Sequence, residues 1–224
     1  MGLVDEIREA RKANRRQARR WEYDQTWYWS ELGDEPDQEG LKSANSKWSS
    51  APSEAYAEYH RLADQGSIIA LYWIGDCYSW GHGVERDLEK AEQFYLKAAN
   101  SGSWTGALRR AHFLARTARF DDCIAVLEDG VSKNVTPFYF WLAWYLHDRG
   151  ADRAEYRRID RLLARADKAG HPQALPFRVR FRASGKLGLR RIPSALKLFG
   201  ELRKRRRQTE RRDTEGLQTQ EGSL

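Results

Sequence analysis

The chain has 224 residues, a formal charge of +7 and a sequence pI near 9.5, and this length suffices for a sizeable core. Its two cysteines are too few for a disulfide framework or a four-cysteine zinc site. Nine Trp, ten Tyr and eight Phe exclude a disordered chain, because so much aromatic surface must be buried. No stretch approaches the roughly 18 apolar residues of a membrane span, and residues 1–8 lack the apolar core of a secretory signal. We therefore expect a cytoplasmic protein.

The first predicted element is a charged helix over residues 3–31 that ends in an aromatic block between Trp21 and Trp29. We expect this helix to cap the helices that follow, since the open end of a helical stack needs a cover. The alternative is an exposed aromatic patch for a partner. Residues 33–50 are rich in Gly, Ser, Asp and Pro and predict a loop that ends at Pro52.

Helical periodicity continues from Ser53, and no Asn-Gly or Asp-Gly turn stands between alternating β-branched residues. The predicted helices, separated by Gly or Pro, are 53–65, 67–80, 87–101, 103–117, 120–129, 135–149, 152–169, 171–184 and 192–212. Beyond Arg212 the residues show no pattern and predict a disordered tail. The sequence thus predicts an all-α fold.

The helix junctions repeat along the chain. Gly66 and Gly102 end two similar segments and lie 36 residues apart, and junctions at Gly130 and Gly170 follow after 28 and 40 residues. A period in the mid-thirties with two helices per unit is typical of an α-solenoid, in which antiparallel helix pairs stack. The predicted domains are an N-terminal helix and linker at 1–50, a helical repeat domain at 51–212 and a tail at 213–224.

Residues 70–102 contain the sharpest motif. Its members are Gly75, Tyr78, Gly81, Gly83, Val84, Asp87, Lys90, Ala91, Tyr95, Lys97, Ala98, Ala99 and Gly102. This motif strongly resembles the Sel1-like repeat, a relative of the tetratricopeptide repeat with a longer turn between its two helices. The resemblance covers about 53–185 with declining quality, and the units after Gly102 lack the Gly-x-Gly-Val turn. It implies a scaffold of stacked helix pairs.

The turn residues have physical roles that do not depend on the resemblance. Gly81 and Gly83 permit positive φ between the two helices. Val84 can pack beneath the helix pair, and Asp87 can cap the second helix. Gly75 and Gly102 complete the predicted structural positions.

No motif points to an enzyme, because the chain lacks a nucleophile elbow, a phosphate loop and a zinc-protease motif. Cys77 and His82 lie five residues apart and could be read as a nucleophile and its base. However, Cys77 falls where small apolar residues pack, and His82 stands between two turn glycines. Asp121 is predicted to cap a helix and Cys123 to lie in the core. We expect no catalytic activity, no cofactor and no metal site.

Charge is unevenly distributed. Residues 51–130 carry eight basic and twelve acidic side chains, whereas residues 131–224 carry 22 basic and ten acidic ones. The densest cluster is Arg203, Lys204, Arg205, Arg206 and Arg207. Such a run can bind nucleic acid, an acidic protein surface or anionic lipid, or it can be a solvated helix end whose charges suit the helix dipole.

We therefore expect a non-catalytic scaffold or adaptor that binds a partner protein or peptide, an acidic partner included, in the groove of the helix stack. By analogy with related arrays, the contacts are expected on helices 67–80, 103–117 and 135–149, and the basic cluster is expected to speed encounter. The alternative is a nucleic-acid-binding repeat protein that uses the basic carboxyl half.

Overall fold

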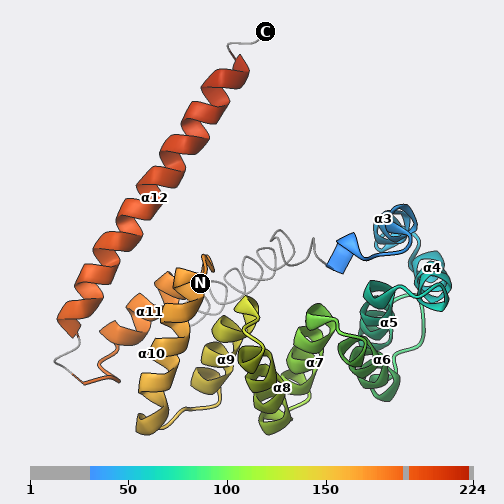
Figure 1. Cartoon of the computed structure of the whole chain (residues 1–224), viewed down its shortest axis with the longest axis horizontal. Coiled ribbons are helices and arrows are strands. Elements are labelled where there is room, and N and C mark those ends of the chain that lie inside the picture. Colours follow the sequence, from blue (N-terminus) through green and yellow to red (C-terminus); the bar gives the residue numbers. More distant parts are fainter. Residues whose placement is uncertain (1–30, 189–191, 222–224) are drawn as a thin grey trace, which may run out of the picture. The chain divides into compact units, whose positions relative to one another are not determined.

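The computed structural model describes residues 31–188 and 192–221 (Figure 1). Its helices are α3 (Gln38–Lys47), α4 (Pro52–Asp64), α5 (Ile68–Trp80), α6 (Leu88–Asn100), α7 (Trp104–Arg116), α8 (Phe120–Ser132), α9 (Thr136–Asp148), α10 (Arg153–Lys168), α11 (Ala174–Ala183) and α12 (Ile192–Glu221). The described ranges contain no strand, and this confirms the predicted all-α fold. The cap predicted at 3–31 lies outside the described residues except for its last position.

The predicted loop at 33–50 is wrong, because α3 occupies most of it. Asp37 caps this helix by accepting a hydrogen bond from the Gly40 N–H at 2.7 Å. Leu41 and Ala44, three residues apart and therefore on one helix face, are buried, and α3 packs on α4. The sequence analysis missed this helix because its composition is polar: its buried face consists of only two apolar residues.

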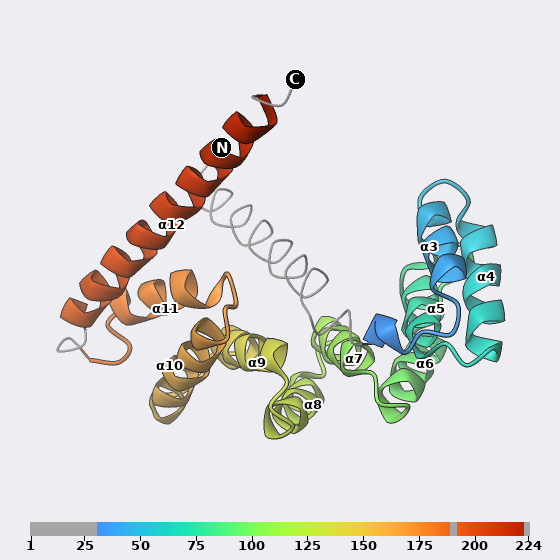
Figure 2. The ribbon, with the colours of Figure 1, turned by 45° about the horizontal axis from the view of Figure 1, so that its top comes forward.

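The described residues divide into two compact units, 31–145 and 146–221, with the boundary inside α9. In the first unit each helix from α3 to α7 packs on the next one along the chain, up to α8. In the second unit α10 packs on α11 and α11 on α12. Figure 2 shows this succession of neighbouring helices within each unit. Pairing of consecutive helices confirms the predicted solenoid architecture.

Helix junctions repeat in their hydrogen bonds as well as in their spacing. Gly66 and Gly102 adopt φ values of 96° and 97°, and the N–H of the following serine bonds back to Leu62 and Ala98, each at 3.0 Å. Those serines then cap α5 and α7, since their hydroxyls accept from the N–H groups of Ala70 and Gly106. The two junctions are thus copies of one local structure.

Helix–helix contacts rest on small residues beneath rings. A Cβ on Gly75 would lie 2.7 Å from the Tyr95 ring, and one on Gly130 would overlap the Phe138 ring. Aromatic residues are the largest of the fully buried side chains among the described residues: Trp141, Tyr59, Tyr72, Phe138 and Phe140 are each under 2% exposed. Close packing of this kind makes each glycine a specific requirement rather than a flexible joint.

Two helix ends differ from their predicted positions. Arg119 rather than Asp121 is the N-cap residue of α8, and Asp121 lies in the first turn, where its charge still suits the helix dipole. The backbone of α12 is helical to Glu221 and so passes the domain boundary predicted at Arg212. Cys123 is fully buried, as predicted.

Candidate functional site

The turn between α5 and α6 is built by residues that the sequence had singled out. Gly81 ends α5 in the left-handed region with φ 67°. Gly83 has φ 75°, and a Cβ there would overlap the carbonyl oxygen of Pro52 at the start of α4. Asp87 caps α6 by accepting from the Lys90 N–H at 3.0 Å, while Val84 is half-buried. The turn therefore sets how α6 returns against α5.

Gly75 allows Tyr95 of α6 to cross α5 and reach a buried carboxylate. The Tyr95 hydroxyl donates to Asp76 Oδ1 at 2.6 Å, and Asp76 is 6% exposed. Burial raises the pKa of Tyr95, and the negative charge of Asp76 raises it further. The tyrosine therefore stays a neutral donor to Oδ1, and Oδ2 of the carboxylate is left for a second partner.

That partner is Arg109 of α7. Its guanidinium forms an ion pair with Asp76 Oδ2 and lies over two rings of α5, at 4.7 Å from the Tyr72 centroid and 4.8 Å from the Trp73 centroid. Through the ion pair and the two cation–π contacts, Arg109 of α7 connects its repeat to α5 of the preceding repeat.

A second arginine–aromatic pair lies further along the same helices. Arg116 donates to the Ser79 hydroxyl, and its guanidinium lies 4.0 Å from the centroid of Trp80. Trp80 remains 57% exposed, although an indole of this size is usually buried. An exposed Trp held by an arginine is the kind of residue that contributes most energy at protein interfaces.

These side chains occupy equivalent positions in successive repeats. The repeat of 36 residues relates three positions of α5 to three positions of α7: Trp73 to Arg109, Asp76 to His112 and Trp80 to Arg116. The spacing of three and four residues places each set on one helix face. We call these six residues the α5–α7 face. His112 adds a hydrogen bond between its Nδ1 and the Tyr145 hydroxyl at 2.9 Å, which connects the face to α9.

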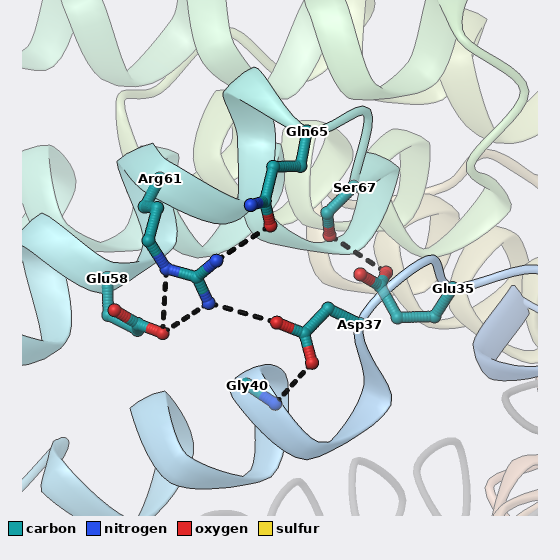
Figure 3. Close-up of polar contacts among 7 residues, drawn as sticks. All are labelled: Glu35, Asp37, Gly40, Glu58, Arg61, Gln65 and Ser67. Carbon is teal, nitrogen blue, oxygen red and sulfur yellow. Dashed lines mark hydrogen bonds and ion pairs between the residues drawn. The ribbon is translucent and has the colours of Figure 1, made fainter.

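Residues 31–37 lie across the first turns of α5 and α7, and the sequence analysis missed this. The Ser67 hydroxyl donates to Glu35 Oε2 at 2.8 Å, and the Thr105 N–H donates to Glu31 Oε1 at 3.2 Å. Arg61 of α4 forms an ion pair with Asp37 at 2.9 Å (Figure 3). Glu31 and Glu35 are four residues apart in the sequence, and each accepts a hydrogen bond at the start of a helix that a serine caps.

Burial governs the chemistry of these carboxylates. It raises the pKa of Glu35 above its ordinary value, and the hydrogen bond from Ser67 only partly opposes this. The pKa of Glu31 is raised for the same reason, against hydrogen bonds from Thr105. Both side chains act as acceptors for the ends of neighbouring helices, so their role is structural.

The cysteines offer no nucleophile. Cys77 and Cys123 are buried, and burial raises the pKa of each thiol to about 12. The His82 ring stacks on Trp48 with centroids 4.0 Å apart, and its Nε2 hydrogen-bonds the Trp48 carbonyl oxygen. Among the described residues, no group of three or more His, Cys, Asp or Glu side chains could hold a metal ion.

The basic cluster lies on α12 in the 146–221 unit, whereas the α5–α7 face belongs to the 31–145 unit. Arg203 and Lys204 are exposed, and Arg205 pairs with Asp167 of α10 at 2.6 Å. The side chains of Arg206 and Arg207 are outside the described set. In the described part of the chain, no helix is long and apolar enough to cross a membrane.

Comparison with known proteins agrees with the repeat geometry. Residues 68–103, which comprise α5, the glycine turn and α6, match the family model of the Sel1 repeat. A search of curated protein sequences finds no match.

Two solved structures share the fold. One is a protective antigen of uropathogenic Escherichia coli strains that displays an SLR fold, with a TM-score of 0.55 and 20% identity over 69% of this chain and 34% of the antigen. The other is a Sel1 repeat protein from Oxalobacter formigenes, with a TM-score of 0.58 and 15% identity over 88% of this chain and 84% of that one. The chain thus spans about a third of the antigen's length.

Proposed function

We propose that the α5–α7 face, which includes the first helix of the Sel1 repeat matched at residues 68–103, binds a segment of a partner protein. The Sel1 repeat fold is generally a scaffold for protein–protein interaction and generally not catalytic. The comparisons give no support to nucleic-acid binding.

The observation that carries the proposal is Trp80. Its indole is 57% exposed, yet Arg116 holds one ring face at 4.0 Å, so the side chain is ordered before a partner arrives. An ordered aromatic side chain loses little rotamer entropy on binding, and this favours affinity. The Asp76–Arg109 pair, one turn earlier on the same face, is satisfied internally and gives the face a rigid base.

The test begins with proteins recovered with a tagged full-length chain from its native cell, followed by titration with the purified partner. Trp80→Ala is expected to weaken binding at least about tenfold, because truncating an interface Trp typically costs about 2 kcal/mol or more. Leu96→Ala is the matched control, since Leu96 is an exposed apolar residue, at 38%, on α6. Equal affinities of the two variants would contradict the proposal.

A further inference from the structure

We propose that a cavity in the 146–221 unit binds a small molecule that carries one or more phosphoryl groups. The cavity has a volume of about 480 Å³ and is lined by Arg157, Asp160 and Arg161 of α10 and by Leu187 of the turn after α11. α10 and α11 pack side by side (Figure 1). This volume falls within the range of about 300–1,000 Å³ that small-molecule sites occupy.

The carboxylate at this cavity is already neutralised. Asp160 accepts hydrogen bonds from two arginines of α11: Arg182 binds both of its oxygens at 2.7 Å, and Arg178 Nε binds Oδ1 at 3.0 Å. Burial by itself would raise the pKa of Asp160, but these hydrogen bonds outweigh it and hold the pKa below the ordinary range. Asp160 therefore stays ionised and has little capacity left for the cations on its own helix.

Those cations are Arg157 and Arg161. Both are exposed, and in the described part of the chain neither has a carboxylate within 4.0 Å. Arg161 Nε donates only a long hydrogen bond, at 3.4 Å, to the Arg157 carbonyl oxygen. With Asp160 as the one acid against Arg157, Arg161, Arg178 and Arg182, the cluster carries a formal excess of three positive charges.

The spacing of the two arginines indicates the ligand class. Arg157 and Arg161 are four residues apart, which places their side chains on one helix face with Cβ atoms about 5–6 Å apart. Two like charges at this spacing repel each other, and an anion between them removes the repulsion. A carboxylate has two oxygens in one plane and suits one guanidinium fork, whereas a phosphoryl group has three oxygens and can accept from two forks.

The experiment is calorimetric titration of the full chain with inorganic pyrophosphate at constant ionic strength. We expect saturable binding of one pyrophosphate per chain. The double variant Arg157→Gln/Arg161→Gln is expected to bind at least tenfold more weakly with an unchanged thermal midpoint, because both side chains are exposed. Absence of saturable binding to the unaltered chain would overturn the proposal.

The matched control is Arg153→Gln/Lys168→Gln. Both residues are exposed on α10 and neither lines the cavity. Their replacement removes two positive charges, as the replacement of Arg157 and Arg161 does. Their replacement is expected to leave the dissociation constant within twofold. If both double variants weaken binding equally, the attraction is a diffuse property of a basic surface and the proposed site is wrong.

Discussion

Asp76 in the 31–145 unit and Asp160 in the 146–221 unit are both largely buried carboxylates that arginines of a later helix neutralise. Asp76 pairs with Arg109 and accepts from the Tyr95 hydroxyl, and the Arg109 guanidinium lies over two aromatic rings. Asp160 has two arginines, while two more arginines on its own helix lack a carboxylate partner in the described residues. A buried aspartate paired with arginines therefore lies in an aromatic face in the 31–145 unit, and beside additional positive charge in the 146–221 unit.

This difference follows the composition of the two regions. Residues 51–130 have a net charge of −4, from eight basic and twelve acidic side chains, so carboxylates outnumber cations there. Residues 131–185 have a net charge of +6, from eleven basic and five acidic ones, so cations outnumber carboxylates. The first unit is suited to binding through apolar contact, and the second to binding anions.

Asp160→Asn should cause the largest loss of stability, and a larger one than the matching substitution of Asp76. The substitution leaves Arg178 and Arg182, with side chains 17% and 11% exposed, without their counter-charge. Breaking a buried pair in this way costs about 3–5 kcal/mol. All nine tryptophans precede Leu146, so the loss is measured by amide hydrogen exchange in α10 and α11 rather than by Trp fluorescence.

Asp76→Asn is the matched substitution in the first unit and should cost less, about 1–3 kcal/mol. Arg109 keeps its contacts with the Tyr72 and Trp73 rings, and the amide oxygen of the substituted side chain can still accept from the Tyr95 hydroxyl. Urea unfolding followed by Trp fluorescence measures this. A loss as large as that of Asp160→Asn would show that ring stacking does not compensate the arginine.

Gly75→Ala tests whether close packing positions the Asp76 network. The added Cβ would lie 2.7 Å from the Tyr95 ring, so the ring or the helix must shift, at a cost of about 1–3 kcal/mol. Gly200→Ala on α12 is the control: it meets nothing within 4 Å and should be neutral or stabilising by up to about 1 kcal/mol. Equal melting midpoints for Gly75→Ala and the unaltered chain would contradict this.

Glu35→Gln should change the pH dependence of the first unit. Because burial raises the pKa of Glu35 above 4.5, the folded state binds the proton more tightly than the unfolded state does. The contribution of Glu35 to the free energy of unfolding is therefore full below the unfolded value and falls as pH rises through the folded value. Trp-fluorescence unfolding at a series of pH values should show a smaller decline above pH 4.5 for the glutamine variant.

Replacement of Arg203 through Arg207 by glutamine should have the smallest effect on affinity. We expect slower association with an acidic partner and a flatter salt dependence, with dissociation nearly unchanged, because exposed charges steer encounter more than they hold a complex. Stopped-flow kinetics at several salt concentrations check this. Loss of binding at every salt concentration would identify the cluster, rather than the α5–α7 face, as the main site.

Much of the fold was predictable because its signals are local. The 36-residue spacing, the glycines at 66, 81, 83 and 102 and the capping Asp87 act through φ angles and hydrogen bonds of neighbouring residues. For the same reason the bounds of α4 to α11 were predicted to within a few residues, whereas α12 continues to Glu221, past its predicted end at Arg212. The helix α3 was missed, because its apolar face is only Leu41 and Ala44 and becomes visible once α4 packs against it.

The sequence by itself therefore determined the helices from α4 onward, their order and the repeat, since periodicity and turn chemistry are carried by adjacent residues. Only the tertiary structure decided which side chains of successive repeats meet. Arg109 pairs with Asp76 and stacks on Trp73, and Arg157 and Arg161 are left over beside Asp160. Charge pairing across helices depends on distances of a few ångström between residues tens of positions apart, and composition does not specify such distances.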